Sequence, residues 1–177
     1  VIKDEDWVLT ANELKHQVRK LWDFDKPYRH PGVELGTATQ IGISIGVALA
    51  YKGTGRLVVD IQPDGDLMFD AGALWVAAKY QIPMLIVMYN NRAYHQEVMH
   101  LQRMANRRQR GMALAHAGLP GSAISDPNID FAMMARSMGA TVPGSVMASY
   151  TTFIFLFAAA GMWAVFSVID FGAWDHP

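Results

Sequence analysis

The sequence predicts an α/β fold, a mainly parallel sheet with helices on both of its faces. Two continuous apolar runs, Arg56–Gln62 and Pro83–Asn90, have the length and composition of buried strands. A helix-length segment, Asp70–Gln81, separates them. Strand, crossover and strand form a βαβ unit. Because such a crossover returns the chain to the same edge, the two strands are expected to be parallel.

The segments before this unit fit the same fold. Asp6–Ala11 is predicted to be a short strand, followed by a helix capped by Asn12. After a loop rich in Pro and Gly, Thr37–Gly53 is small, apolar and long enough for a helix. Its glycines suggest close packing against another element.

Two further helices are predicted after the unit. Ile129–Ala140 is amphipathic, with Asp130 near its start. The other lies within Glu97–Gly111. Three of its basic residues recur at helical spacing: Arg103, Arg107 and Arg110. These arginines would bind phosphate or an acidic partner, or they would simply face solvent, which is the usual place of such charges.

Composition excludes several classes of protein. The chain has 177 residues, 51% of them hydrophobic, which suits one domain with a sizeable core. Fifteen basic and sixteen acidic residues leave a formal charge of −1, which argues against a nucleic-acid partner. The absence of cysteine excludes disulfides, thiolate zinc sites and cysteine nucleophiles. It also fits a reducing compartment, so a cytoplasmic location is expected.

The two ends of the chain differ from an ordinary domain. The first residues have neither a starting Met nor a signal-peptide pattern, so the sequence is expected to be a fragment of a longer chain. Residues 144–169 contain no charged side chain and are long enough to span a bilayer, which would attach the chain to a membrane. They could instead be one or two buried elements of the same domain, or sequence foreign to it. The expected organisation is a domain at 1–143 and an apolar tail at 144–177.

Polar side chains follow both strands of the βαβ unit. Asp64 comes after the first strand and Asn91 after the second. Ligands of open parallel sheets bind beyond the carboxyl ends of the strands, where these two residues would lie side by side. One carboxylate, one amide oxygen and a backbone carbonyl make half of the octahedral oxygen cage that Mg²⁺ prefers. Substrate phosphates and water commonly supply the rest.

The residues after Asp64 suit a phosphate group. Gly65 lets the backbone approach closely and offers its amide. Asp66 stands at the start of the next helix, so its amide and the positive end of the helix dipole would both attract a phosphate group. Asp-Gly turns and Asn-Asn strand ends are each common. Their register on one βαβ unit is what indicates a metal–diphosphate anchor.

The Asp-Gly and Asn-Asn pairs, at this spacing, resemble the cofactor motif of thiamine diphosphate-dependent enzymes, usually Gly-Asp-Gly ending in Asn-Asn. Ala73–Pro83 looks like the branch with acetolactate synthase and benzoylformate decarboxylase-like proteins. The resemblance runs from about Asp6 to Gly139 and covers the pyrophosphate-binding domain, typically the last third of such an enzyme. It implies thiamine diphosphate and Mg²⁺ as cofactors, and decarboxylation or carboligation of a 2-oxoacid.

The resemblance also implies roles for individual positions. It implies three Mg²⁺ ligands: the side chains of Asp64 and Asn91 and the carbonyl of Ala93. It implies three backbone amides that hold the diphosphate: those of Gly65, Asp66 and Tyr94. Leu35 would be the apolar support that bends thiamine into its reactive shape, and the Val33 carbonyl would accept from the aminopyrimidine.

Some positions depart from the family pattern. Pro63 replaces the first Gly of the motif. Thr37 and Gln40 stand where many relatives have larger apolar residues or proline, so the resemblance does not fix the substrate preference. His30 and His95 are candidates for contact with substrate, or ordinary loop histidines.

No catalytic residue is assigned within this chain. In the family the base is a glutamate of the pyrimidine-binding domain, contributed across a dimer interface. None of the glutamates here lies in that motif: Glu5, Glu13, Glu34 and Glu97. A homo-oligomer is therefore expected, with a pyrimidine-binding domain of the same or a partner chain, and the isolated chain is expected to be inactive.

Two other functions stay open. The chain could be a membrane-anchored binding module with a vestigial cofactor site, or a Mg²⁺-dependent phosphate-ester enzyme on a similar sheet. Titration with thiamine diphosphate and Mg²⁺, compared with simple nucleotides, separates these functions.

Overall fold

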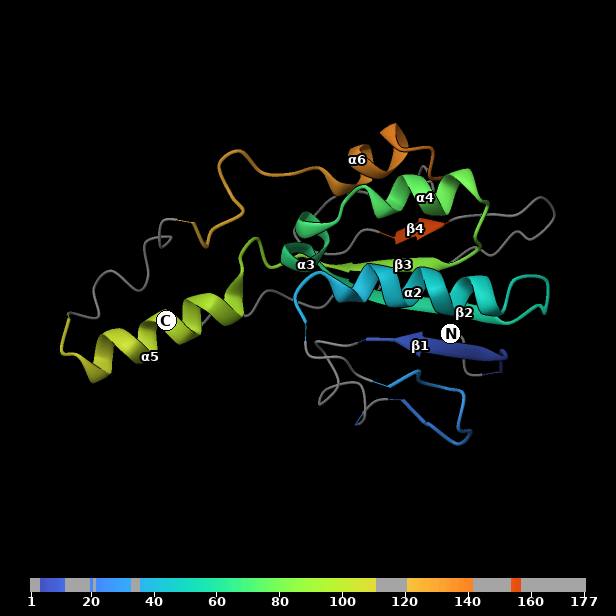
Figure 1. The fold of residues 1–177 in the computed structure, drawn as a ribbon, viewed down its shortest axis with the longest axis horizontal. Coiled ribbons are helices and arrows are strands. Elements are labelled where there is room, and N and C mark those ends of the chain that lie inside the picture. The colour runs from blue at the N-terminus through green and yellow to red at the C-terminus, as the bar shows by residue number, and fades with distance from the viewer. Residues whose placement is uncertain are drawn as a thin grey trace.

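A computed structural model describes residues 4–11, 20, 22–32, 36–110, 121–141 and 154–156. In this part of the chain, the strands form one sheet in the order β1-β2-β3-β4 (Figure 1). The strands are β1 (Trp7–Thr10), β2 (Leu57–Pro63), β3 (Leu85–Tyr89) and β4 (Ile154–Leu156). The helices are α2 (Thr39–Ala50), α3 (Asp64–Phe69), α4 (Ala73–Lys79), α5 (His95–Arg107) and α6 (Phe131–Ser137).

The first three strands are parallel. Leu9 of β1 lies opposite Val59 of β2, and Val59 lies opposite Leu85 of β3. Helices connect the strands, as parallel pairing requires. β4 adds an antiparallel edge, with Phe155 opposite Ile86. The predicted α/β fold with a mainly parallel sheet is confirmed.

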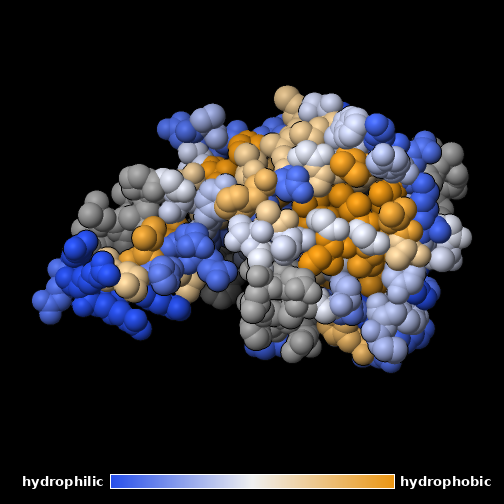
Figure 2. Space-filling view, viewed as in Figure 1, coloured by the Kyte–Doolittle hydropathy of each residue, from blue (hydrophilic) through white to orange (hydrophobic). Residues whose placement is uncertain are grey.

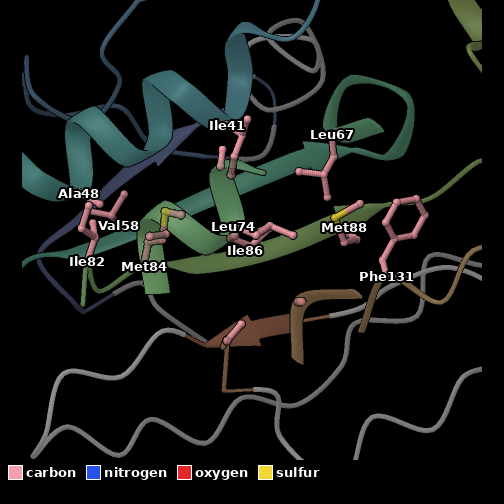
Figure 3. Packing of buried hydrophobic residues seen from close by; sticks show 14 of the residues in the cluster. Ile41, Ala48, Val58, Leu67, Leu74, Ile82, Met84, Ile86, Met88 and Phe131 are labelled. Atoms are coloured by element: carbon pink, nitrogen blue, oxygen red, sulfur yellow. The ribbon is translucent and has the colours of Figure 1, made fainter. Parts of the chain in front are cut away.

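The main core lies between one face of the sheet and the helices. Val58 and Ile86 point to this face, where Ile41 of α2, Leu74 of α4 and Phe131 of α6 pack against them (Figure 3). All five side chains are almost completely buried. Burial of a large apolar side chain contributes roughly 1.5–3 kcal/mol, so this layer holds α2, α4 and α6 to the strands.

The other face of the sheet has a smaller core. Trp7 packs edge-on against Trp22 and Phe24, with ring centroids 5.0 and 5.9 Å apart. The Arg29 guanidinium lies 4.1 Å from the Trp7 ring centroid and donates to the Trp7 carbonyl. The described helices that pack on the sheet thus lie on one face. The predicted helix that begins after Asn12 falls outside the described residues.

The helix before β2 lies where the sequence predicts it, but its glycines are used differently. α2 buries Gln40, Ile41, Ser44 and Ala48. Gly42 and Gly46 lie on the opposite side, where a Cβ would meet no atom within 4 Å. The expectation that these glycines mark close packing is therefore wrong for the described part of the chain.

The predicted helix over Asp70–Gln81 is shorter in the structure than the sequence predicts. α4 begins only at Ala73, and the separate helix α3 precedes it. α5 begins two residues before the predicted Glu97. Asp130 caps α6, because its Oδ1 accepts from the Met133 amide at 2.8 Å.

α5 extends away from the sheet and has no buried residue (Figures 1 and 2). The arginines predicted at helical spacing are exposed. Arg103 and Arg107 lie in α5, and Arg110 lies just after its end. Their exposure fits the solvent-facing interpretation. Apolar side chains gather instead over α2 and α4 (Figure 2), where Leu49 and Trp75 are exposed.

Within the described residues, no helix has the length and apolar character needed to cross a membrane. The short strand β4 falls inside the predicted tail, and the remainder of 144–177 lies outside the described residues.

Candidate functional site

The ends of β2 and β3 bring the two predicted metal ligands to one edge of the sheet. β2 and β3 are adjacent and parallel, with Pro63 opposite Tyr89. Asp64 follows Pro63 directly as the first residue of α3, and Asn91 comes two residues after Tyr89. Pro63 has extended backbone angles, φ −68° and ψ 140°, so the departure from Gly at this position still lets the chain turn into α3.

The Asp64 carboxyl group is buried against the loop that follows β3. Burial raises its pKa above the ordinary value, while backbone amides of Gly65, Arg92, Ala93 and Asn91 lower it. Its Oδ2 atom is buried and has no hydrogen-bond partner among the described residues. Buried oxygens without a partner are rare and call for a ligand, water or ion. A divalent cation fits this orphaned oxygen.

The asparagine pair shapes the loop after β3. Asn90 Oδ1 accepts from the Arg92 amide at 3.2 Å, and Asn91 Oδ1 accepts from the Ala93 amide at 3.1 Å. Arg92 has a positive φ of 58°, which such local side-chain turns tolerate. An amide oxygen has two lone pairs, so Asn91 Oδ1 keeps one for a metal.

Gly65 lies beneath this loop. The Ala93 carbonyl oxygen would be 3.5 Å from a Cβ placed on Gly65. The third predicted Mg²⁺ ligand is therefore next to the turn that carries the first one. Within the described residues, no three His, Cys, Asp or Glu side chains group around a metal position. A donor set with one carboxylate, one amide oxygen and one carbonyl would not form such a group.

A segment that the sequence did not single out supports the loop from the other side. The Tyr94 amide donates to the Ser122 carbonyl at 2.8 Å, and the Ile124 amide donates to the Arg92 carbonyl at 2.7 Å. Ala93 and Ala123 form the bridge between these bonds. The Tyr94 amide, predicted to hold the diphosphate, is thus bonded to Ser122 in this structure. The roles predicted for the Gly65 and Asp66 amides, in the first turn of α3, stay predictions.

Asp66 uses its side chain as well as its amide. The buried carboxylate accepts from the Ala38 and Gln40 amides at the start of α2. The sequence interpretation included only the Asp66 amide, because no local pattern connects residue 66 with residue 38.

Gln40 lies in the interior of the domain. Its side chain is 1% exposed and donates to Asp60 Oδ1 at 2.6 Å inside the core. Gln40 thus lies on the buried side of α2.

The other candidates are placed as follows. Val33 and Leu35 lie outside the described residues. His30 accepts from the Gly32 amide at 3.0 Å and packs against Phe24 at 5.9 Å between ring centroids, as an ordinary loop histidine would. His95 is exposed as the first residue of α5.

Comparisons with known proteins agree with this geometry. Residues 13–171 match the family model described as the thiamine pyrophosphate enzyme, C-terminal TPP binding domain. A Mycobacterium tuberculosis protein named as an acetolactate synthase large subunit, IlvX, is 32% identical over 104 residues, which are 59% of this chain and 19% of that protein.

Among solved structures, the chain is similar to a thiamine diphosphate-dependent 4-hydroxybenzoylformate decarboxylase from Rhodococcus jostii RHA1. The TM-score is 0.54 at 24% identity, over 76% of this chain and 23% of the other, and this similarity supports the fold. The chain thus spans about a fifth of the length of these relatives. The family-model match covers most of the chain, and the chain therefore belongs to the thiamine pyrophosphate enzymes, with the C-terminal TPP-binding domain of that family.

Proposed function

We propose that the chain holds thiamine diphosphate through Mg²⁺ and is the cofactor-binding part of a 2-oxoacid decarboxylase or carboligase similar to acetolactate synthase. The observation that carries this proposal is the position of Asp64. Its buried carboxylate has an oxygen without a partner among the described residues and faces the loop that contains Asn91 and Ala93.

The residues present fit a bound Mg²⁺–diphosphate group. Asp64, Asn91 and the Ala93 carbonyl would supply the protein ligands of the metal, which prefers oxygen donors and shares its shell with phosphates. Gly65 carries no Cβ, so the Tyr94 ring and the Ala93 carbonyl can lie close to the turn that contains Asp64. When bound, thiamine diphosphate supplies an electron sink for loss of CO₂ from a 2-oxoacid. The protein would bind and orient it and exclude water.

The choice of a 2-oxoacid as substrate is supported by the names of the relatives, one an acetolactate synthase subunit and the other a 4-hydroxybenzoylformate decarboxylase. Decarboxylation and carboligation share the same cofactor chemistry. Both stay within this proposal, and so does a cytoplasmic location.

The isolated chain is proposed to bind the cofactor without turning over substrate. The base glutamate is proposed to lie on a pyrimidine-binding domain. In support, the chain spans about a fifth of the length of its relatives. General acid–base groups contribute about 10²–10⁴ in rate. The active form would therefore need that domain, on the same or a partner chain, in a homo-oligomer.

Calorimetric titration tests the proposal. We expect saturable binding of thiamine diphosphate with Mg²⁺, abolished by EDTA, and no comparable binding of ATP. Binding of ATP alone would favour a phosphate-ester enzyme instead. CO₂ release from pyruvate, benzoylformate and 2-oxobutyrate should be at background for the chain alone and should appear on addition of a separately made pyrimidine-binding domain. Robust turnover by the chain alone would show that the base is misplaced.

A further inference from the structure

The Asp66 carboxylate joins two parts of the chain that are far apart in sequence. It lies on α3, two residues after Asp64. Its Oδ1 accepts from the Ala38 amide at 2.6 Å, and its Oδ2 accepts from the Gln40 amide at 3.2 Å. The residue is 8% exposed. Hydrogen bonds to a buried carboxylate are about twice as strong as those between neutral groups.

These bonds replace a cap that α2 does not have in its own sequence. The residue before α2 is Ala38, which has no side-chain oxygen to accept the first amides and has a positive φ of 69°. Ala rarely adopts that conformation, and Ala is a poor residue at a helix start. Asp66 supplies the missing acceptor from another element and places a negative charge at the positive end of the helix dipole.

Two further contacts fix the geometry of this connection. Gln62 Nε2 donates to Asp66 Oδ2 at 3.4 Å, which orients the carboxylate from β2. Further along α2, the hydroxyl oxygen of Ser44 lies 2.7 Å from that of Thr10 in β1. This hydrogen bond joins α2 to β1. The start of α2 is thus held both to the sheet and to the turn that contains Asp64.

We propose that Asp66 is a positioning residue of the cofactor site, which fixes Gly36–Gln40 against the Asp64–Gly65 turn through its side chain. This inference rests on the proposed function, in which the turn holds the diphosphate, and on the family resemblance, which implies that Leu35, the residue before Gly36 in the sequence, supports the organic part of the cofactor. The carboxylate would then set the distance between the two parts of the site. Asp66 itself need not touch the cofactor with its side chain.

The inference predicts a split between two ligands. In Asp66→Asn, an NH₂ group replaces one of the two oxygens that accept from the Ala38 and Gln40 amides, so one or both of these hydrogen bonds are lost. Affinity for thiamine diphosphate with Mg²⁺ should fall about ten- to hundred-fold, the range expected for losing hydrogen bonds to a charged group. Affinity for inorganic pyrophosphate with Mg²⁺ should remain, because Asp64, Asn91 and Gly65 are intact. Asp70→Asn removes the same charge from an exposed position near the end of α3 and should change neither affinity.

Equal loss of both affinities in Asp66→Asn, or loss of neither, would overturn the positioning role. A wild-type chain that binds neither ligand would overturn the proposed function and, with it, this inference.

Hydrogen exchange of the unaltered chain gives a test that does not depend on the stability of a variant. Thiamine diphosphate with Mg²⁺ should slow exchange at the Ala38 and Gln40 amides, whereas inorganic pyrophosphate with Mg²⁺ should protect only the Asp64–Gly65 turn. Protection of that turn by thiamine diphosphate without any change at Ala38 and Gln40 would show that Asp66 does not couple the two segments.

Discussion

Gly65 and Tyr94 lie in direct contact: a Cβ placed on Gly65 would be 2.8 Å from Cδ1 and 3.2 Å from Cε1 of the tyrosine ring. The Tyr94 ring also packs against Phe69, with the two ring centroids 5.2 Å apart. Glycine is therefore required at position 65 because the Tyr94 ring occupies the space that a Cβ would need.

Gly65→Ala should displace the Tyr94 ring and the loop that holds Ala93. Overpacking of this kind typically costs about 1–3 kcal/mol, and we expect a loss of unfolding free energy in that range together with weaker Mg²⁺-dependent cofactor binding. Urea denaturation and calorimetric titration measure the two effects. Gly42→Ala is the matched control. A Cβ there has open space within a helix, so this variant should gain about 0.5–1 kcal/mol. Equal stability of both variants would show that the contact with Tyr94 is not restrictive.

Asp64→Ala should abolish Mg²⁺-dependent binding of thiamine diphosphate with little loss of fold. The carboxylate provides charge for the metal, and its orphaned oxygen makes burial without a metal unfavourable. Asn91→Ala should act in the same direction but less completely, since an amide oxygen carries no net charge. Calorimetry with and without Mg²⁺ checks both variants. Unchanged cofactor affinity in Asp64→Ala would exclude Asp64 as a metal ligand.

The position of Asp64 beside the Asn91 loop could be predicted from sequence because βαβ geometry is general. Two apolar runs with a helix-length crossover give adjacent parallel strands, and parallel strands end at the same edge. Residues that directly follow those strands are therefore placed without knowledge of packing. The same reasoning holds for Asp130, whose capping role depends only on its own helix.

Contacts between distant segments could not be predicted in this way. The bond from the Tyr94 amide to Ser122 and the bonds from Ala38 and Gln40 to Asp66 join residues 26 to 28 positions apart. No period or local motif encodes them. The prediction that the glycines of α2 pack closely is wrong for a related reason. Small residues suit both a tight contact and an open face, and only the packing of Ile41 and Ala48 decides which side of the helix is buried.

Asp60 should make the free protein less stable as pH rises. Asp60 is fully buried, which raises the pKa of its carboxyl group to about 7 from 3.8, although hydrogen bonds from Gln40, Ser44 and Thr10 oppose the shift. The nearby Asp66 charge raises it further. Since the folded state binds this proton more tightly, its contribution to stability is fully present below pH 3.8 and is lost as pH rises through about 7.

The unfolding free energy should therefore fall by up to about 1.4 kcal/mol per pH unit between the two pKa values. Asp60→Asn keeps an acceptor for Gln40 and should flatten this dependence, whereas Asp70→Asn at an exposed position should leave it unchanged. Urea denaturation at intervals from pH 5 to 8 gives the slopes. An Asp60→Asn slope equal to that of wild type would mean that another group titrates.

Truncation after Pro143 should destabilise the sheet. The pairing of β4 with Leu85–Val87 lies within the segment that such a truncation removes. Without β4, β3 would become an edge strand with unpaired backbone groups, and Leu85 and Ile86 are among its buried residues. We expect a lower melting temperature, with a loss of about 0.5–1.5 kcal/mol for each hydrogen bond removed. Cofactor affinity should persist, because Asp64 and Asn91 lie beyond the strand ends.

A shorter truncation after Phe157 keeps β4 and is the control. Improved solubility with unchanged melting after removal at Pro143 would instead indicate that the tail is foreign to the domain. Resistance of the full chain to carbonate extraction would indicate that it spans a membrane.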